Sequence, residues 1–439
     1  MQRRKRAVLR WGFGCLATVV AALLVSASAQ ALPAPEEDPF YRYEGSTPLS
    51  QIAPGTVLKT RVVPYSVAGI PLPIKAVQLL YRSAGALGQP TVNVTSVLLP
   101  PWHFGTPNVL SYQSFYDSLN PKDEPSYQIA GGFSLGGLIP DVESLLIAPA
   151  LLSGNAVVVT DIEGEQADFA AGPEYGFNTL YGIQAALNSP ATGLAGARKI
   201  GLLGYSGGAI GTEWAVELAP HYDPALNARI VGAAFGGVLV DPAHNLRYVE
   251  GSRVWAGVIP MALIGIARAY GVNLAPYLSP YGKELYEKLQ RASIFEVLGA
   301  YPGLTWSELA SPAYPTPESV PVYVQLANQL IMGSRGTPTA PLFIGQGAGG
   351  ELEGTPGDKP GIGPGDGVMI AGDVRSLARE YCERGDKVQY VEYPSLSHVL
   401  AAVPWLFEAY AWLAGRFAGL PAPQDCASIP PGNPLTPIP

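Results

Sequence analysis

The stretch from Lys199 to Ala219 constrains the fold of this chain more than any other. A short apolar run, Ile200 to Leu203, predicts a buried strand and leads into Gly204-Tyr205-Ser206-Gly207-Gly208. Apolar residues at roughly helical spacing follow, so the sequence predicts a strand, a tight turn and a helix. This order is typical of a nucleophile elbow, in which a strained turn projects the serine above a sheet. We therefore expect Ser206 to be a nucleophile and the N–H of Gly207 to face an oxyanion.

The same G-x-S-x-G pattern occurs a second time, at Gly132-Phe133-Ser134-Leu135-Gly136. No apolar strand precedes this match, because Pro125 to Gly132 has the composition of a loop. The pattern is weak evidence when the strand and the helix around it are missing. We therefore expect Ser134 to have no catalytic role.

Short apolar or alternating runs recur along the chain and predict strands. The expected strands are Val57–Val63, Val77–Arg82, Thr91–Leu99, Asn108–Gln113, Ala156–Asp161, Lys199–Leu203, Arg229–Ala234, Pro341–Gly345 and Lys387–Tyr393. The first three are expected to be antiparallel, and an amphipathic helix is expected at Tyr175–Asn188. Alternation of strands and helices over the remainder indicates an α/β fold with a mostly parallel sheet flanked by helices.

One region interrupts this alternation. Residues 241–336 are almost wholly helical in pattern, with helices expected at Val254–Tyr270, Tyr281–Ala300 and Ser319–Met332. We interpret this region as an inserted helical cap, and its apolar character favours a hydrophobic substrate. A simple enlargement of the core remains the alternative. The expected organisation is a leader at 1–31, a core in two parts at 32–240 and 337–426, the cap between them, and a Pro-rich tail at 427–439.

The N-terminus has the pattern of a secretory signal peptide. A basic segment, an apolar run from Trp11 to Val25 and the cleavage motif Ala29-Gln30-Ala31 follow one another. We therefore expect an exported protein that is cleaved near Ala31. The leader carries none of the 35 acidic residues, so cleavage makes the chain more acidic than its formal charge of −8. An acidic surface argues against nucleic acid or anionic lipid as a partner.

Three cysteines are present, and Cys15 lies inside the predicted leader. Cys382 and Cys426 remain as a pair in an oxidising compartment, so we expect them to form one disulfide. No spacing of Cys and His residues suggests zinc, and we expect neither a metal nor another cofactor.

A serine nucleophile needs a base and a carboxylate that orients the base. The four histidines are His103, His221, His244 and His398. In α/β-hydrolases the chain order is serine, acid, histidine, with the histidine after the last strand. Only His398 has that position, since His103 precedes the elbow, His221 ends its helix and His244 comes too early. His398 is therefore the expected base.

Several carboxylates between the eighth predicted strand and His398 compete as the triad acid. The candidates are Glu351, Glu353, Asp358, Asp366 and Asp373. The first three lie in a loop rich in Gly and Pro, although Glu351 is closest to the strand end. Asp373 falls in the first turn of a predicted helix, where the helix dipole already explains an acid. We choose Asp366, which lies where the loop returns to that helix, and Glu351 remains the alternative.

Several motifs in order resemble the secretory lipases of fungi and actinobacteria, the lipase-A type, over nearly the whole chain after the leader. They are Gly204–Gly208, Asp161–Gly164 with Ala171, Gly172 and Gly176, the run Ser111–Ser118, and the closing Cys382 and His398. The resemblance implies an α/β-hydrolase fold with a helical cap and hydrolysis of acylglycerols and other carboxylic esters. It implies Ser206 as nucleophile, His398 as base, and Gly207 and Asp117 as backbone oxyanion donors. Asp366 matches the acid of this type, which precedes a helix that ends in Cys.

We therefore expect a secreted serine lipase or carboxylesterase that works through an acyl-enzyme on Ser206. An acyltransferase would use the same residues and differ only in whether an alcohol or water removes the acyl group. A catalytically silent hydrolase fold that binds lipid is the alternative from another class. The expected partner is a hydrophobic ester or lipid substrate, with at most transient contact with a lipid interface.

Overall fold

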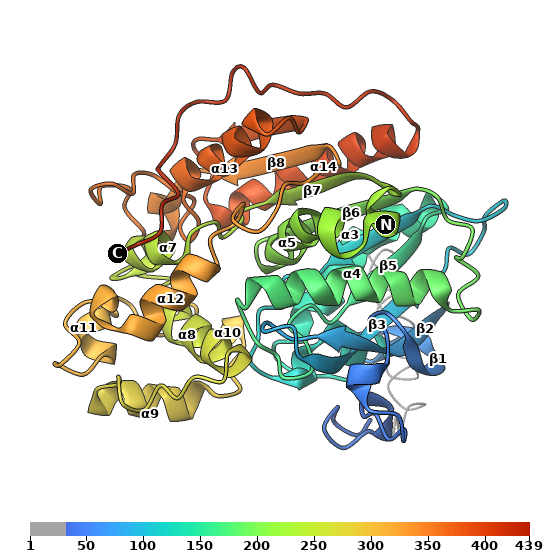
Figure 1. The fold of residues 1–439 in the computed structure, drawn as a ribbon, viewed down its shortest axis with the longest axis horizontal. Coiled ribbons are helices and arrows are strands. Elements are labelled where there is room, and N and C mark those ends of the chain that lie inside the picture. The colour runs from blue at the N-terminus through green and yellow to red at the C-terminus, as the bar shows by residue number, and fades with distance from the viewer. Residues whose placement is uncertain (1–31) are drawn as a thin grey trace, which may run out of the picture. The chain divides into compact units, whose positions relative to one another are not determined.

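A sheet of nine strands organises the chain, in the order β1-β2-β3-β5-β4-β6-β7-β8-β9 (Figure 1). The computed structural model describes residues 32–439; the predicted leader, residues 1–31, lies outside the described part. The strands are β1 Val57–Val67, β2 Ile70–Ala84, β3 Pro90–Leu98, β4 Val109–Gln113, β5 Ala156–Thr160, β6 Ile200–Tyr205, β7 Ile230–Gly236, β8 Leu342–Gly347 and β9 Val388–Tyr393. Each of them overlaps a predicted strand.

The sheet has an antiparallel and a parallel part. β1, β2 and β3 pair antiparallel, and β3 pairs antiparallel with β5. From β5 through β4, β6, β7 and β8 to β9 every pairing is parallel. β4, β5 and β6 are buried along their whole length, as their apolar sequences require for strands covered on both faces.

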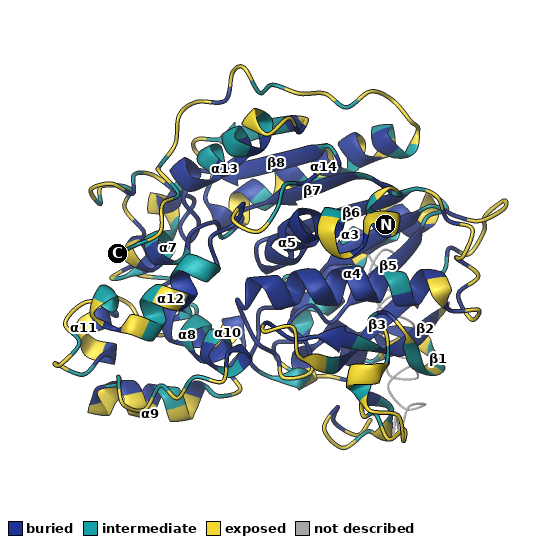
Figure 2. Ribbon diagram, viewed as in Figure 1, coloured by how far each residue is buried: buried dark blue, intermediate teal, exposed yellow. Residues whose placement is uncertain are grey.

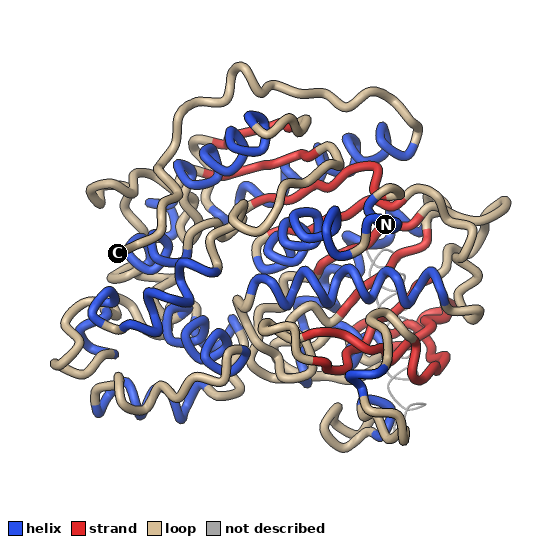
Figure 3. The backbone as a smooth tube through the Cα atoms, in the orientation of Figure 1, coloured by secondary structure: helices blue, strands red, loops and turns tan. Residues whose placement is uncertain are grey.

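Helices cover both faces of the sheet. On one face lie α4 (Gly172–Asn188), α5 (Gly207–Tyr222) and α13 (Ala371–Glu383), which share one apolar core with the strands. On the other face α3 (Leu138–Leu152) and α14 (His398–Phe417) share a second core. Figure 1 shows α4 and α5 in front of the sheet, and Figure 3 shows the strands running between the two helix layers. This arrangement confirms the predicted α/β class.

Two local expectations differ from the structure. The segment expected to be a loop before Ser134 contains the short helix α2, Pro125–Ile129. The helix α4 is buried on almost every side (Figure 2) rather than amphipathic. Its glycines explain this burial: a Cβ on Gly176 would lie 2.9 Å from the backbone of Trp214, so α4 packs tightly against α5.

The six helices between β7 and β8 form the region predicted as a cap. They are α7 Pro242–Val249, α8 Val258–Ala269, α9 Pro280–Leu289, α10 Ile294–Val297, α11 Trp306–Leu309 and α12 Pro321–Gln329. Most of their buried apolar residues belong to one cluster, which also includes residues outside the region, such as Leu119, Phe169 and Ile370. The predicted helix Tyr281–Ala300 is divided in two, because Ser293 and Glu296 form a capping box that starts α10 anew.

The tail after Cys426 has no helix or strand and runs back over the molecule as an extended strap. Asn433 donates to the carboxylate of Asp373, and Ile438 exchanges two hydrogen bonds with the side chain of Asn328 in α12. Residues Pro35–Pro439 form one compact unit. Within residues 32–439 no helix has both the length and the hydropathy needed to span a membrane.

Candidate active site

Ser206 occupies the turn between β6 and α5, as the elbow pattern predicts. Its backbone has φ 54° and ψ −123°, a conformation that non-glycine residues rarely adopt. The neighbouring strand holds this turn, since the Ser206 N–H donates to the carbonyl of Gly236 at 2.9 Å. Strain of this kind persists only where the surrounding structure enforces it, and it is common at functional sites.

The glycines around Ser206 are required by close packing. A Cβ on Gly204 would lie 2.2 Å from the carbonyl oxygen of Gly208. A Cβ on Gly207 would lie only 1.7 Å from Oδ1 of Asp117. Neither contact is sterically possible, so any larger residue would displace the serine or the loop that carries Asp117.

His398 begins α14, and its imidazole connects Ser206 to Asp366. Nε2 lies 2.8 Å from the hydroxyl oxygen of Ser206, and Nδ1 lies 2.7 Å from Oδ2 of Asp366. Tyr205 supports the same residue, because its hydroxyl donates to the His398 carbonyl at 2.6 Å. The three residues that the sequence selected as a triad are thus brought together in hydrogen-bonding order, and all three are buried.

Asp366 is fixed by four hydrogen bonds to its carboxylate. Oδ1 accepts from the backbone N–H groups of Val368 and Met369 at 3.0 and 2.7 Å. Oδ2 accepts from the side chain of Gln346, at the end of β8, and is bonded to His398. The carboxylate is therefore oriented before any substrate arrives, which a triad acid requires.

The electrostatics of the site favour a basic imidazole. Burial alone would lower the pKa of His398, but the Asp366 carboxylate at Nδ1 raises it above its ordinary value. Negative charge on Glu353 and Asp117 acts in the same direction. A base with a raised pKa accepts the serine proton more readily.

Gly207 and Asp117 lie beside Ser206, where the resemblance placed the oxyanion donors. Gly207 opens α5, and Asp117 follows β4 with a positive φ of 34°. The cap holds the Asp117 loop in place, since the Asp117 carbonyl accepts from the Ile294 N–H at 2.9 Å. Ser118 and Ser293 form an isolated antiparallel bridge at the same point. The cap and this corner of the site are therefore directly connected.

The Asp117 side chain is itself unusual. Burial raises the pKa of its carboxyl to about 7, although the positive charge available on His398 opposes the shift and Glu143 adds to it. An acid beside an oxyanion site is compatible with catalysis while it is protonated, because an ionised carboxylate would repel the developing negative charge.

Three further residues surround the triad. Gln346 and Trp255, which the sequence did not identify, contact it directly, whereas Glu353, a candidate acid in the sequence, contacts Trp255 and the residue after His398. Gln346 donates to Asp366. The ring of Trp255, from the cap, meets His398 edge-on with centroids 5.3 Å apart. Glu353 accepts from Trp255 Nε1 at 2.7 Å and from the Val399 N–H at 3.0 Å. No local pattern marks these residues, since each belongs to the site only through contacts distant in sequence.

Ser134, the serine of the second G-x-S-x-G match, does not contact the predicted triad. The Ser134 hydroxyl donates to the carbonyl of Lys122 and accepts from the Gly137 N–H just before α3. His244 also has a carboxylate partner, Asp373, at 3.1 Å, but this pair joins the start of the cap to α13. Among residues 32–439 no group of three or more His, Cys, Asp and Glu residues is arranged to bind a metal ion.

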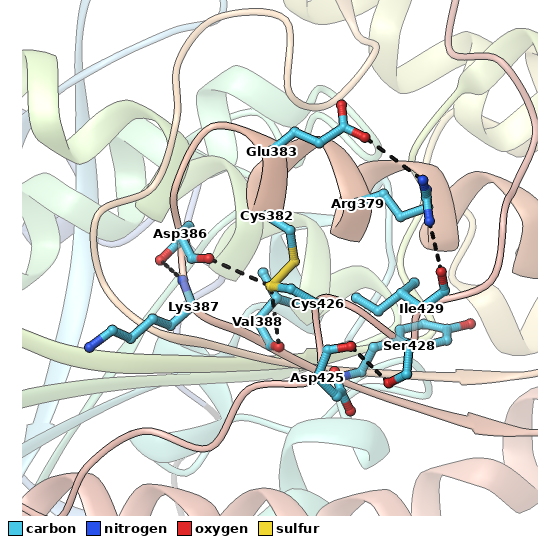
Figure 4. The surroundings of a disulfide bond; sticks show 11 residues. Arg379, Cys382, Glu383, Asp386, Lys387, Val388, Asp425, Cys426, Ser428 and Ile429 are labelled. Carbon is cyan, nitrogen blue, oxygen red and sulfur yellow. Dashed lines mark hydrogen bonds and ion pairs between the residues drawn. A yellow bond between two sulfur atoms is a disulfide. The ribbon is translucent and has the colours of Figure 1, made fainter.

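Cys382 and Cys426 are joined by a disulfide, as expected (Figure 4). The bond connects α13 to the start of the C-terminal tail, with Cα atoms 5.7 Å apart. The tail is also held beside β9, since the Asp425 N–H donates to the Val388 carbonyl and the Tyr390 N–H donates to the Asp425 side chain. Asp366 precedes α13, so the disulfide anchors the far end of the helix that follows the predicted acid.

Comparison with known proteins identifies the family of the chain. The profile of the secretory lipase family matches residues 132–354. A Mycobacterium tuberculosis protein named a probable inactive lipase is 32% identical over 401 residues, 88% of this chain and 83% of that protein. Lipase A of Arthroderma benhamiae is 31% identical over 412 residues, 89% of this chain and 81% of that protein.

A solved structure extends the comparison to the fold. Candida antarctica lipase A in its closed state superposes with a TM-score of 0.77 and 26% identity, over 93% of this chain and 92% of that one. The family match, the relatives and the arrangement of the sheet lead to one conclusion: the chain belongs to the secretory lipase family and has the α/β-hydrolase fold.

Proposed function

We propose that this protein is a secreted serine ester hydrolase in which Ser206, His398 and Asp366 form the catalytic triad. One observation carries the proposal: an unbroken hydrogen-bonded chain from the Ser206 hydroxyl through the His398 ring to the Asp366 carboxylate. The distance from Ser206 to His398 is short enough for proton transfer, and the bond to Asp366 orients the imidazole ring. The strained backbone of Ser206 supports the same role.

The reaction begins when His398 Nε2 accepts the proton of the Ser206 hydroxyl. The serine oxygen attacks the ester carbonyl carbon and forms a tetrahedral intermediate, while Asp366 stabilises the imidazolium. His398 then gives its proton to the departing alcohol, which leaves an acyl group on Ser206. Water, deprotonated by His398, attacks this acyl group, and the acid is released as the serine recovers its proton.

The backbone N–H groups of Gly207 and Asp117 are the proposed oxyanion donors. Gly207 stands at the positive end of the α5 dipole, which favours negative charge. The Asp117 side chain packs against Gly207, because Gly207 has no side chain to exclude its carboxyl group. Two donors fixed in advance stabilise the intermediate without reorganisation.

The substrate proposed is a hydrophobic carboxylic ester such as an acylglycerol. Two apolar cavities support this class, one within the cap and one between the cap and the core, and Leu263, Ile266 and Tyr323 line both of them. An acyl chain is stabilised in such a cavity by removal of its apolar surface from water. The names of the lipase relatives agree with this class.

Replacement of the serine tests the mechanism. Ser206→Ala should abolish hydrolysis of p-nitrophenyl esters and labelling by a fluorophosphonate probe while the far-UV circular dichroism is unchanged. Ser134→Ala is the matched control and should retain activity within a few-fold. Labelling of Ser134 in place of Ser206 would contradict the proposal, and a series of acyl chain lengths would define the preferred ester.

A catalytically silent, lipid-binding protein is the second candidate, favoured by the printed name of the M. tuberculosis relative. The intact Ser206, His398 and Asp366 network argues against it in this chain. A wild-type protein that binds long-chain esters but neither reacts with the fluorophosphonate nor turns over a soluble ester would establish this candidate instead.

A further inference from the structure

Two neighbouring helices expose apolar side chains along one side each. On α3 these are Val142, Leu145 and Leu152, and on α14 they are Val399, Val403 and Phe407. Leu145 is 73% exposed and Phe407 is 74% exposed. The spacing on α14 is four residues each time, so its members form a single stripe along the helix. We call these six residues the α3–α14 face.

One residue of each stripe contributes to a surface shared by the two helices. Leu145 and Phe407 line the same groove, which has a volume of about 480 Å³ and runs between α3 and α14. The hydroxyl of Tyr410 donates to the backbone carbonyl of Leu146 and ties the helices together across this groove. Contiguous exposed apolar surface of this kind marks a site of interaction, because solvation of such a surface is unfavourable.

The α3–α14 face carries no charge. The two acids of α3, Asp141 and Glu143, are buried, and Glu143 is bonded to Tyr112. From His398 to Phe407 the helix α14 contains no Asp, Glu, Lys or Arg. Glu408, at the edge of the face, is bonded to the Tyr393 hydroxyl. The face is therefore neutral in a chain whose formal net charge is −8.

The face begins at the proposed active site. His398 is the first residue of α14 and is buried, whereas the next residue, Val399, is 61% exposed. The N–H of Val399 donates to Glu353, and Leu352, beside Glu353, is also exposed. An apolar partner seated on this face would therefore lie next to the helix end that supplies the proposed catalytic base.

We propose that the α3–α14 face is the surface by which the protein adsorbs to a neutral lipid surface. This inference rests on the proposed function, because the ester substrate of such an enzyme is part of that surface. A lipid surface fits better than a second copy of the chain, since two acidic copies repel one another and an uncharged lipid does not. Adsorption is driven by burial of the apolar stripes.

The test compares adsorption to phosphatidylcholine vesicles with turnover of dissolved p-nitrophenyl acetate. The variant is Leu145→Ser combined with Phe407→Ser, both on the helix surface and neither in the proposed site. We expect its adsorption to fall by about a hundredfold, since burial of each of the two large apolar side chains contributes about tenfold. Turnover of the dissolved ester should stay within about twofold of wild type, a range that corresponds to a change well under 1.4 kcal/mol.

Leu87→Ser provides the matched control, because Leu87 is 66% exposed in the turn between β2 and β3. Adsorption of Leu87→Ser should equal that of wild type. Anionic lipid added to the vesicles should weaken the adsorption of wild type and of Leu87→Ser alike, because the chain is acidic. Unchanged adsorption of the double variant, or an equal loss in Leu87→Ser, would overturn the inference. So would a wild-type dimer that the double variant dissociates. Wild-type adsorption through this face without turnover of any ester would support the inference and reject the proposed function.

Discussion

His398 and Asp366 are joined twice: the His398 N–H donates to the Asp366 backbone carbonyl at 2.7 Å, and Nδ1 lies 2.7 Å from the Asp366 carboxylate. The first bond fixes where α14 begins, and the second fixes the orientation of the ring. Asp366 and His398 are thirty-two sequence positions apart, with α13 and β9 between them, and these two bonds hold the ends of that segment together at the proposed site. Asp366 therefore positions both the first residue of α14 and the imidazole ring of the proposed base.

Asp366→Asn should nearly silence the enzyme. The amide preserves the shape of the side chain but offers no charge to the imidazolium and favours the wrong tautomer, which costs about 10⁴ in kcat in triads of this kind. Asp373→Asn is the control, because Asp373 is bonded to His244 and Asn433 instead. Steady-state kinetics on a soluble ester measure the effect. Near-normal turnover in Asp366→Asn would reject Asp366 as the triad acid and leave Glu351 as the alternative.

The Asp117 carboxyl should limit activity at alkaline pH. Burial raises its pKa to about 7, so above that pH the side chain ionises beside the proposed oxyanion site. Repulsion of the developing oxyanion should then lower kcat/KM as the pH rises. Asp117→Asn keeps the shape and does not titrate, so its profile should stay flat on the alkaline side. Identical alkaline limbs in the two proteins would exclude this role.

Glu353 should tune His398 through space. Its negative charge raises the pKa of His398, and its carboxylate also bonds Trp255 of the cap. In Glu353→Gln the pKa of His398 should fall, so the acidic limb of the kcat profile should move to lower pH. The exposed neighbour Glu351 provides the control substitution, Glu351→Gln, which should leave the limb in place. A loss of activity without movement of the limb would indicate a purely structural role.

Removal of the disulfide should destabilise the fold more than the site. Cys382 and Cys426 are separated by 44 positions. Closure of a loop of this length stabilises the folded state by about 4 kcal/mol in the chain-entropy model. The double variant Cys382→Ala, Cys426→Ala should show that loss in urea unfolding but keep turnover of soluble esters near wild type, because Asp366 and His398 have their own hydrogen bonds. Two titratable thiols in the unreduced wild-type protein would refute the bond itself.

The folded protein should gain stability as the pH falls from about 7 to about 5. Burial raises the pKa to about 7 for a group of carboxyls comprising Asp117, Glu143, Asp161, Asp168 and Asp386. In the unfolded chain these groups titrate near 3.8 or 4.5, so between those values and 7 the folded state holds protons that the unfolded state has released. Acid therefore favours the folded state across this window.

Carboxyl groups whose pKa is lowered in the folded state do not alter the expectation between about pH 7 and about pH 5. Partial burial opposes the shift, but arginine partners lower the pKa of Glu36, Glu318 and Glu392 below 4.5. Their contribution is lost only at more acidic pH. Urea unfolding at the two pH values measures the effect, and Asp386→Asn should reduce the difference. Lower stability at about pH 5 than at about pH 7 would contradict the expectation.

Much of the architecture was determined by local sequence. The strand β6 ends at Tyr205 and α5 opens with Gly207, so Ser206 lies in the strained turn between them, and a short pattern was sufficient to predict this elbow. Apolar or alternating runs located the strands, and the uninterrupted apolar runs marked β4, β5 and β6, which are buried along their whole length. His398 was identified by its position after the last strand, and Cys382 and Cys426 were the only cysteines left to pair after the leader.

Only the tertiary structure decided which side chains contact one another. Glu351, Glu353, Asp366 and Asp373 are chemically similar acids in one segment, and only packing separates them: Asp366 meets His398, Glu353 meets Trp255, and Asp373 meets His244. The exposed stripes of α3 and α14 likewise became one surface only when the fold placed the two helices side by side. Local pattern determines backbone conformation because it acts over a few residues. Side-chain partners are chosen by contacts between residues distant in sequence, and only the folded chain creates those contacts.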